Sequence, residues 1–330
     1  MSKQLRAAIA GHGSYVPQKV LTNQDLERMV DTSDEWITRR TGIKERRIAT
    51  NGESTASMAV QAARRACETA GVDPADVDLI ACATITPETL CPASACHIQR
   101  DLGATNAAAF DLAAACSGFI YSLAIGARFI EAGQYRNCLI IGAETLTRYT
   151  DYEDRGSCIL FGDGAGAVLL QPTDEADKGV QYTVLHADGN GWDFIYIPAG
   201  GSRLPASART VADRQHYFKM RGRDVYKFAV EKMRWLLGDC MDACGLTATD
   251  VDLVVPHQVN IRILESAAER YGLPMDKVYI NIDRYGNTSS ASIPIALDEA
   301  IRTQRVGAGS TVLLAAFGAG LTWAGAVIRL

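Results

Sequence analysis

The feature that most constrains how this chain folds is an internal repeat. The segment Ala70–Ile80 resembles Cys244–Val254 in residue type and spacing, and Asp76 and Asp250 lie 174 positions apart. Repeated units of this kind bury their apolar faces against their neighbouring copies. We therefore predict two similar halves, with any active site at the place where they meet.

Two softer matches support the repeat. Asp111 and Asp283 each precede a turn of small residues and a helix, and they are 172 positions apart. Cys138 and Thr311 each begin an apolar run before a glycine-rich hairpin, and they are 173 positions apart. The alternative, that these matches arise without a duplication, stays open at this point. Unrelated α/β units also share aspartate-capped turns and valine-rich strands.

Short apolar strands alternate with alanine-rich helices along the chain. The strands Leu79–Ala83 and Cys138–Ile141 are examples, and the stretch Ser54–Ala70 is typical of a helix. This alternation predicts the α/β fold class. Combined with the repeat, it divides the chain into an N-terminal half of residues 1–174 and a C-terminal half of residues 175–330.

Composition favours a globular protein of the cytoplasm. Of the 330 residues, 48% are hydrophobic and 22% are charged. The chain has no apolar run of the roughly 18 residues that a membrane helix needs, and Met1–Ala10 has no signal-peptide pattern. The net charge of −5 argues against binding to nucleic acid.

The cysteines indicate a reducing compartment. There are nine, an odd number, and they are scattered through alanine-rich segments rather than arranged as a disulfide framework. No Cys-x-x-Cys pair occurs and the five histidines are far apart in the sequence. We therefore expect no metal site.

One cysteine has the surroundings of a nucleophile. Cys116 lies between a short strand and an apolar helix, in a run of alanines followed by Gly118. A helix N-terminus offers free amides and the positive end of the helix dipole, which we expect to lower the pKa of the thiol. The small neighbours leave room for a thioester to reach the sulfur.

The repeat adds two partners. Ala83 shifted by 174 positions is His257, which follows the apolar run Leu253–Pro256, and α/β proteins place their chemistry at such strand ends. Cys116 shifted by 172 positions is Thr288, directly after Asn287. The repeat thus predicts that a thiol, an imidazole and an amide converge.

These residues carry a family resemblance that covers essentially the whole chain. The sequence resembles the ketoacyl synthase III branch of the thiolase superfamily in eight segments: Thr32–Ile37, Arg40–Ile43, Ala115–Gly118, Asp154–Gly156, Phe161–Ala167, Pro256–Arg262, Gly286–Ser292 and Phe317–Trp323. The resemblance implies a thiolase-like fold in which the two pseudo-symmetric halves form an αβαβα layered structure.

The resemblance also implies a reaction. Cys116 would take an acyl group from an acyl-CoA, with acetyl-CoA the expected donor, while the backbone amides of Cys116 and Ala319 stabilise the oxyanion. His257 and Asn287 would then donate hydrogen bonds to malonyl-acyl-carrier protein during its decarboxylation. The product is a 3-oxoacyl-carrier protein that initiates fatty acid synthesis. No cofactor is expected, since CoA and phosphopantetheine are substrates.

The same resemblance assigns residues to binding. Trp36 and Arg155 would enclose the adenine of CoA, Arg40 would pair with its phosphates, and Gly222 and Asn260 would line the pantetheine channel. Three cations are expected to contact the acidic carrier protein: Lys227, Arg262 and Arg270. Leu90 and Cys91 are expected at the acyl pocket of a homodimer, across the interface between subunits.

Two other classes of function remain open. A relative with the same machinery can serve specialised metabolism or, like hydroxymethylglutaryl-CoA synthases, act on another acceptor. In the resemblance, Asn287 argues against thiolases and hydroxymethylglutaryl-CoA synthases, which use a cysteine and a glutamate for comparable tasks. A non-catalytic partner subunit is disfavoured because Cys116, His257 and Asn287 are all present.

The acyl-pocket assignment predicts the effect of Cys91→Phe. The larger side chain fills space for several methylenes, each worth about 0.8 kcal/mol when buried, so octanoyl-CoA loading falls about a hundredfold relative to acetyl-CoA. The measurement is the ratio of the two loading rates in wild type and variant, with both confirmed as dimers. An unchanged ratio would place the determinant of chain length elsewhere.

Overall fold

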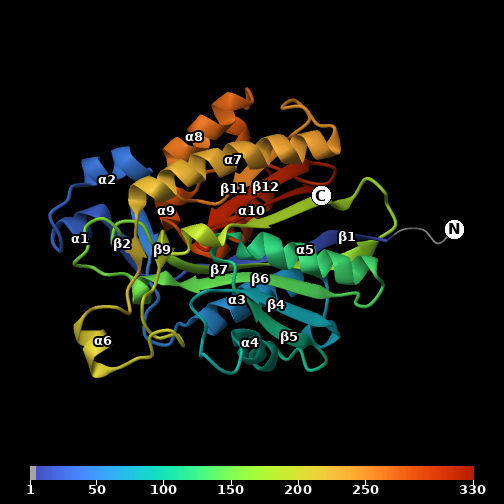
Figure 1. The fold of residues 1–330 in the computed structure, drawn as a ribbon. Coiled ribbons are helices and arrows are strands. Elements are labelled where there is room, and N and C mark those ends of the chain that lie inside the picture. Colours follow the sequence, from blue (N-terminus) through green and yellow to red (C-terminus); the bar gives the residue numbers. More distant parts are fainter. Residues whose placement is uncertain (1–4) are drawn as a thin grey trace.

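Two mixed β-sheets form the centre of the computed structural model, which describes residues 5–330 (Figure 1). The first sheet has the order β1 (Arg6–Tyr15), β7 (Asp163–Thr173), β6 (Cys138–Thr145), β4 (Leu79–Ala83) and β5 (Ala108–Leu112). The second sheet has the order β11 (Leu253–Pro256), β12 (Thr311–Gly318), β13 (Thr322–Arg329) and β8 (Gly179–Ala187). Four short strands form two separate pairs: β2 (Val20–Thr22) with β3 (Glu45–Arg47), and β9 (Ile195–Tyr196) with β10 (Lys219–Met220).

Helices cover both sheets and separate them. The long ones are α3 (Thr55–Ala70), α4 (Ser94–Leu102), α5 (Gly118–Glu131), α7 (Gly222–Cys244), α8 (Ile261–Arg270) and α10 (Ser292–Arg302). The shorter ones are α1 (Asn23–Glu27), α2 (Asp34–Thr41), α6 (Ala208–Ala212) and α9 (Ile282–Tyr285). Helix α6 belongs to an excursion that projects from the layers in Figure 1.

The core is arranged in layers. One apolar cluster joins α5 and α10 to the inner faces of both sheets, through side chains such as Phe119 and Leu297. A second cluster packs α3 and α4 on the outer face of the first sheet, and a third packs α7 and α8 on the outer face of the second. The predicted αβαβα layered fold is therefore confirmed.

The two halves repeat each other in strand pairing. Leu79 pairs with Cys138 in parallel in the first sheet, and Leu253 pairs with Val312 in parallel in the second, an offset of 174 for both strands. The helix start Gly118 likewise corresponds to Ser292. The strand pairing shows that the internal repeat, first seen in the sequence, extends to the tertiary structure.

Three of the predicted correspondences are wrong in detail. Asp111 lies in β5 whereas Asp283 lies in α9, and at the offset of 174 the counterpart of Asp111 is Tyr285. The 3-10 turns Ala115–Ser117 and Ser289–Ala291 match at an offset of 174, so the counterpart of Cys116 is Ser290 and not Thr288. Strand pairing likewise makes Val312, not Thr311, the counterpart of Cys138.

The halves meet through close backbone contacts that only glycine permits. A Cβ atom added to Gly142 of β6 would lie 2.2 Å from the Ser290 carbonyl oxygen, which belongs to the second half. Overpacking of an interior costs free energy because the surrounding backbone must move. Gly142 therefore sets the distance between β6 and the turn that follows Asn287.

This contact predicts that Gly142→Ala lowers the free energy of unfolding by about 3 kcal/mol, since the new methyl group collides with backbone rather than with a flexible side chain. Chemical denaturation followed by circular dichroism measures the change. Gly201→Ala is the matched control, because nothing lies within 4 Å of the added Cβ at that exposed position. Equal stability of the two variants would contradict the proposed close contact.

Candidate active site

Cys116 sits in a sharp turn between β5 and α5. Its neighbour Ala115 has a φ of 47°, a left-handed conformation that is rare for a residue with a side chain and that turns the chain abruptly. On the other side, a Cβ atom added to Gly318 would lie 2.6 Å from the Cys116 amide nitrogen. The end of β12, which leads to Ala319, therefore runs directly against the backbone of Cys116.

The electrostatics of Cys116 differ from the sequence-based prediction. The predicted helix start does follow Cys116, yet burial raises the pKa of its thiol to about 12. A neighbouring carboxyl, Glu144, also raises the pKa, while Ser289 and the Cys116 amide lower it by a smaller amount. The prediction of a lowered pKa was wrong, because removing the thiolate from water is the largest influence on the pKa of Cys116.

His257 ends β11 as a buried, neutral ring. Its backbone amide donates to the Ala315 carbonyl across 2.8 Å, which extends the pairing of β11 with β12 by one residue. The ring packs edge-on against Phe317, with 5.8 Å between ring centroids. Burial lowers the pKa of His257 to about 3, so the imidazole is neutral at physiological pH. A neutral imidazole has one N–H to donate.

Asn287 is fixed by backbone contacts on both sides. Its amide nitrogen donates to the Leu160 carbonyl across 2.8 Å, and its own carbonyl accepts from Gly162 across 3.0 Å. Its side-chain oxygen accepts from the Ser289 amide across 2.8 Å. Since the oxygen is held in this way, the NH2 group is the part of the side chain that can donate to a ligand.

A continuous series of neighbours joins the three residues. His257 packs on Phe317, and the next residue, Gly318, runs against Cys116. Ser289 lies close enough to Cys116 to lower the pKa of the thiol, and its amide holds Asn287. The thiol, the imidazole and the amide predicted from the repeat thus belong to one site at the junction of the halves.

A second group of predicted residues gathers around α2. The Arg155 guanidinium lies 4.9 Å from the centroid of Trp36, and that of Arg40 lies 5.3 Å from it. The Asn260 side chain donates to the Arg40 carbonyl across 3.0 Å and so joins the start of α8 to the end of α2. An indole with two guanidinium groups suits a flat, anionic ligand such as a nucleotide. Gly222 lies at the exposed start of α7.

Relatives identify the family. A β-ketoacyl-[acyl-carrier-protein] synthase III of Caldanaerobacter subterraneus subsp. tengcongensis is 53% identical over 329 residues, which are 100% of this chain and 99% of the relative. The chain belongs to the 3-oxoacyl-[acyl-carrier-protein] synthase III family. The profile of that synthase matches residues 110–189, and the profile of its C-terminal part matches residues 241–330.

Solved structures of the synthase III family share the fold. The enzyme from Aquifex aeolicus superposes with a TM-score of 0.90 at 45% identity, covering 98% of this chain and 100% of the other. A priming β-ketosynthase from a polyketide biosynthetic pathway also reaches a TM-score of 0.90, at 37% identity, covering 98% and 96%. The thiolase-like architecture described above is therefore that of the synthase III family.

The remaining predicted residues lie on the surface. Lys227 is exposed on α7, and Arg262 and Arg270 are exposed near the two ends of α8, beside α7 in Figure 1. Leu90 is 89% exposed and Cys91 is also exposed, both in the loop between β4 and α4. In a single subunit of this synthase III family member, Leu90 and Cys91 therefore face solvent.

Sequence reasoning missed Glu144, Ser289 and Ser290. Each is buried beside the Cys116 turn, and Glu144 influences the pKa of Cys116. The signal that could have found Ser290 was the repeat itself, because the offset of 174 leads from Cys116 to Ser290. The offset of 172 led to Thr288 instead.

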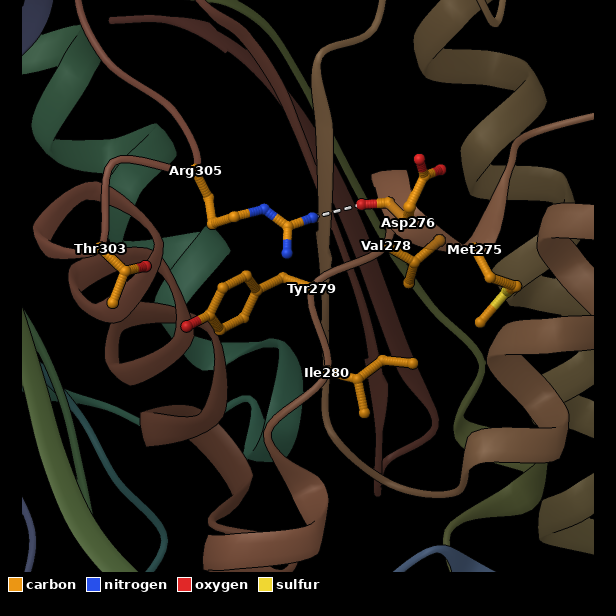
Figure 2. A pocket seen from close by; sticks show the side chains of 7 residues that line it. All are labelled: Met275, Asp276, Val278, Tyr279, Ile280, Thr303 and Arg305. Carbon is orange, nitrogen blue, oxygen red and sulfur yellow. Dashed lines mark hydrogen bonds between the residues drawn. The ribbon is translucent and has the colours of Figure 1, made fainter.

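Other features of residues 5–330 lie apart from this site. A hollow of about 500 Å³ lies beside the outer edge of the second sheet, between Met275 and Arg305, and shares no lining residue with the site (Figure 2).

Within the described residues, no cluster of His, Cys, Asp or Glu is arranged to hold a metal ion. None of the described helices is long and apolar enough to cross a membrane.

The raised pKa of Cys116 predicts its reactivity. Below a pKa of about 12, the thiolate fraction grows about tenfold per pH unit, so alkylation of Cys116 by iodoacetamide should accelerate about a hundredfold from about pH 7 to about pH 9. Mass spectrometry of the Cys116 peptide gives the rate of alkylation. The Cys116→Ser variant is the control, because only its other cysteines can be alkylated. A rate that levels off below pH 8 would instead indicate a thiol activated by the helix dipole.

Proposed function

We propose that this family member condenses an acyl-CoA with malonyl-acyl-carrier protein, giving a 3-oxoacyl-carrier protein, CoA and CO2. The observation that carries the proposal is the pairing of a neutral His257 with the fixed Asn287 amide beside the Cys116 thiol. Both are hydrogen-bond donors that do not readily release a proton, which is what a carbanion intermediate requires.

The first half-reaction is acyl transfer to Cys116. The sulfur forms a bond to the acyl carbon, the carbon–sulfur bond to CoA breaks, and the thiol proton leaves with the CoA sulfur. Two backbone amides, those of Cys116 and Ala319, are proposed to stabilise the tetrahedral oxyanion. This assignment is supported by the contact of Gly318 with the Cys116 amide, because residue 319 follows directly.

The second half-reaction is decarboxylation and condensation. The bond from malonyl carbon to CO2 breaks, and its electron pair moves toward the thioester oxygen, which accepts hydrogen bonds from His257 and Asn287. The resulting carbanion attacks the acyl carbon and expels the Cys116 thiolate, which then takes up a proton from solvent. Loss of one such donor typically costs about 3–4 kcal/mol of transition-state stabilisation.

The proposal extends to the partners. CoA is proposed to bind with its adenine between Trp36 and Arg155 and its phosphates at Arg40, while Gly222 and Asn260 line the pantetheine channel. The carrier protein is proposed to dock on Lys227, Arg262 and Arg270, whose positive charges complement an acidic partner.

A cytoplasmic homodimer completes the proposal. Its support is the position of β5 at an open edge of the first sheet, with a second copy supplying Leu90 and Cys91 to the acyl pocket. All nine cysteines are free, which fits a reducing compartment. Primary fatty acid synthesis is the proposed setting. The similarity to a polyketide priming ketosynthase keeps a specialised pathway as the second candidate.

The test uses intact-mass analysis with a panel of acyl-CoAs. We expect wild type to gain a single acyl group, mapped to Cys116, and Cys116→Ser to gain none. The acyl group that loads fastest distinguishes a straight-chain primer from a specialised one. Loading of Cys91 or Cys158, with normal loading of Cys116→Ser, would overturn the assignment of the nucleophile.

The roles of the donors predict a separation of the half-reactions. His257→Ala and Asn287→Ala should each slow malonyl decarboxylation by about 100-fold to 1,000-fold, since each removes one oxyanion-type donor. Acyl loading should survive at least in part, because neither side chain is needed to form the acyl-enzyme. The two rates are measured separately as CO2 release and mass gain. Equal losses in both would indicate a Cys–His base pair instead.

A further inference from the structure

Glu144 is a fully buried carboxyl group at the end of β6 that the proposed reaction does not use. Its Oε2 atom accepts four hydrogen bonds from the turn that follows β4: from the Ile85 and Thr86 amides at 3.1 Å and 3.2 Å, and from the Thr84 and Thr86 hydroxyls at 3.2 Å and 2.6 Å. Its Oε1 atom lies 3.0 Å from the Ser290 hydroxyl of the other half. No ion pair to Glu144 occurs among residues 5–330, although an isolated buried carboxylate is costly.

The hydroxyl of Ser290 has one proton and two neighbouring acceptors. It lies 2.8 Å from the Ala83 carbonyl oxygen and 3.0 Å from Glu144 Oε1. A carbonyl oxygen can only accept, so the shorter contact takes the Ser290 proton. A proton on Glu144 Oε1 would then complete the second contact, with Ser290 as the acceptor. Burial, which raises the pKa of Glu144, acts in the same direction.

We propose that Glu144 is a neutral carboxylic acid which donates to Ser290, and that this hydrogen-bonded chain from Glu144 through Ser290 to Ala83 positions the Asn287 turn opposite Cys116. Glu144 is thus a positioning residue rather than a catalytic one. Its role in the reaction rests on the proposed function. The titratable groups that would sense a charge on it are the thiols of Cys82 and Cys116, because an ionised Glu144 raises the pKa of both.

The repeat explains why this chain of hydrogen bonds exists. At the offset of 174, Ser290 is the counterpart of Cys116, Ala83 is that of His257, and Glu144 is that of Gly318. Gly318 has no side chain, so its backbone lies directly against Cys116. Glu144, at the equivalent position, instead carries a side chain that reaches the Ser290 hydroxyl.

The contacts of Glu144 affect both the position of the Asn287 turn and the charge of the site. Ser290 is anchored to the first half by Ala83 and Glu144, and its neighbour Ser289 holds the Asn287 side chain. A neutral Glu144 places no negative charge near the Cys116 thiolate. This matters because like charges in a buried site repel strongly.

Infrared spectroscopy tests the protonation state directly. We expect the C=O stretching band of a protonated carboxylic acid in wild type at neutral pH, and its loss in Glu144→Gln. Glu144→Gln should keep a melting temperature close to that of wild type, since its NH2 group can donate to Ser290 and its oxygen can accept from Thr86. Absence of the band, or a Glu144→Gln protein that fails to fold, would overturn the neutral-acid assignment whatever reaction the enzyme performs.

Kinetics test the positioning role. Glu144→Ala should slow malonyl decarboxylation about tenfold while acyl loading changes about twofold or less, and Glu144→Gln should restore most of the decarboxylation rate. Ser290→Ala should likewise slow decarboxylation more than it slows acyl loading. Equal loss of both half-reactions in Glu144→Ala, or no rescue by glutamine, would contradict positioning of Asn287. If wild type releases no CO2 from malonyl-carrier protein, the proposed function fails, while the infrared result stands independently.

Discussion

The structure depends on the close approach of two backbones at the junction of its halves. Helices α5 and α10 lie between the sheets, and the turns that begin them pack against strands of both halves. Glycines at positions 142 and 318 make the contact possible, because a Cβ at either would meet backbone atoms of the opposing turn at 2.2 Å and 2.6 Å. Van der Waals packing at this distance fixes Cys116 and Asn287 relative to each other.

Burial at this junction sets the chemical state of the site. Burial favours a neutral His257 and a protonated Cys116 at physiological pH. The same burial strengthens every hydrogen bond made to a developing negative charge. A buried site with neutral donors is suited to holding an oxyanion or enolate, and the buried carboxyl group of Glu144 is surrounded by hydrogen-bond donors.

Sequence reasoning found the fold because its evidence was periodic and local. The alternation of strands and helices gave the α/β class, and the repeat gave two halves with Cys116, His257 and Asn287 at their junction. It failed near residue 283, because the second half forms the short helix α9 where the first half has strand β5, so the match of Asp111 to Asp283 gave a wrong offset. It also failed on the pKa of Cys116, because the helix dipole can be inferred from sequence whereas the depth of burial cannot.

The sequence by itself determined which side chains exist at the strand ends and turns, the family they indicate, and the duplication that relates them. Only the tertiary structure decided how deeply those groups are buried and which of them share a proton. Glu144 shows the difference, since it contacts Thr86 and Ser290, which are 58 and 146 positions away in the sequence. Desolvation and hydrogen bonding act through space, and spacing along the chain carries no record of either.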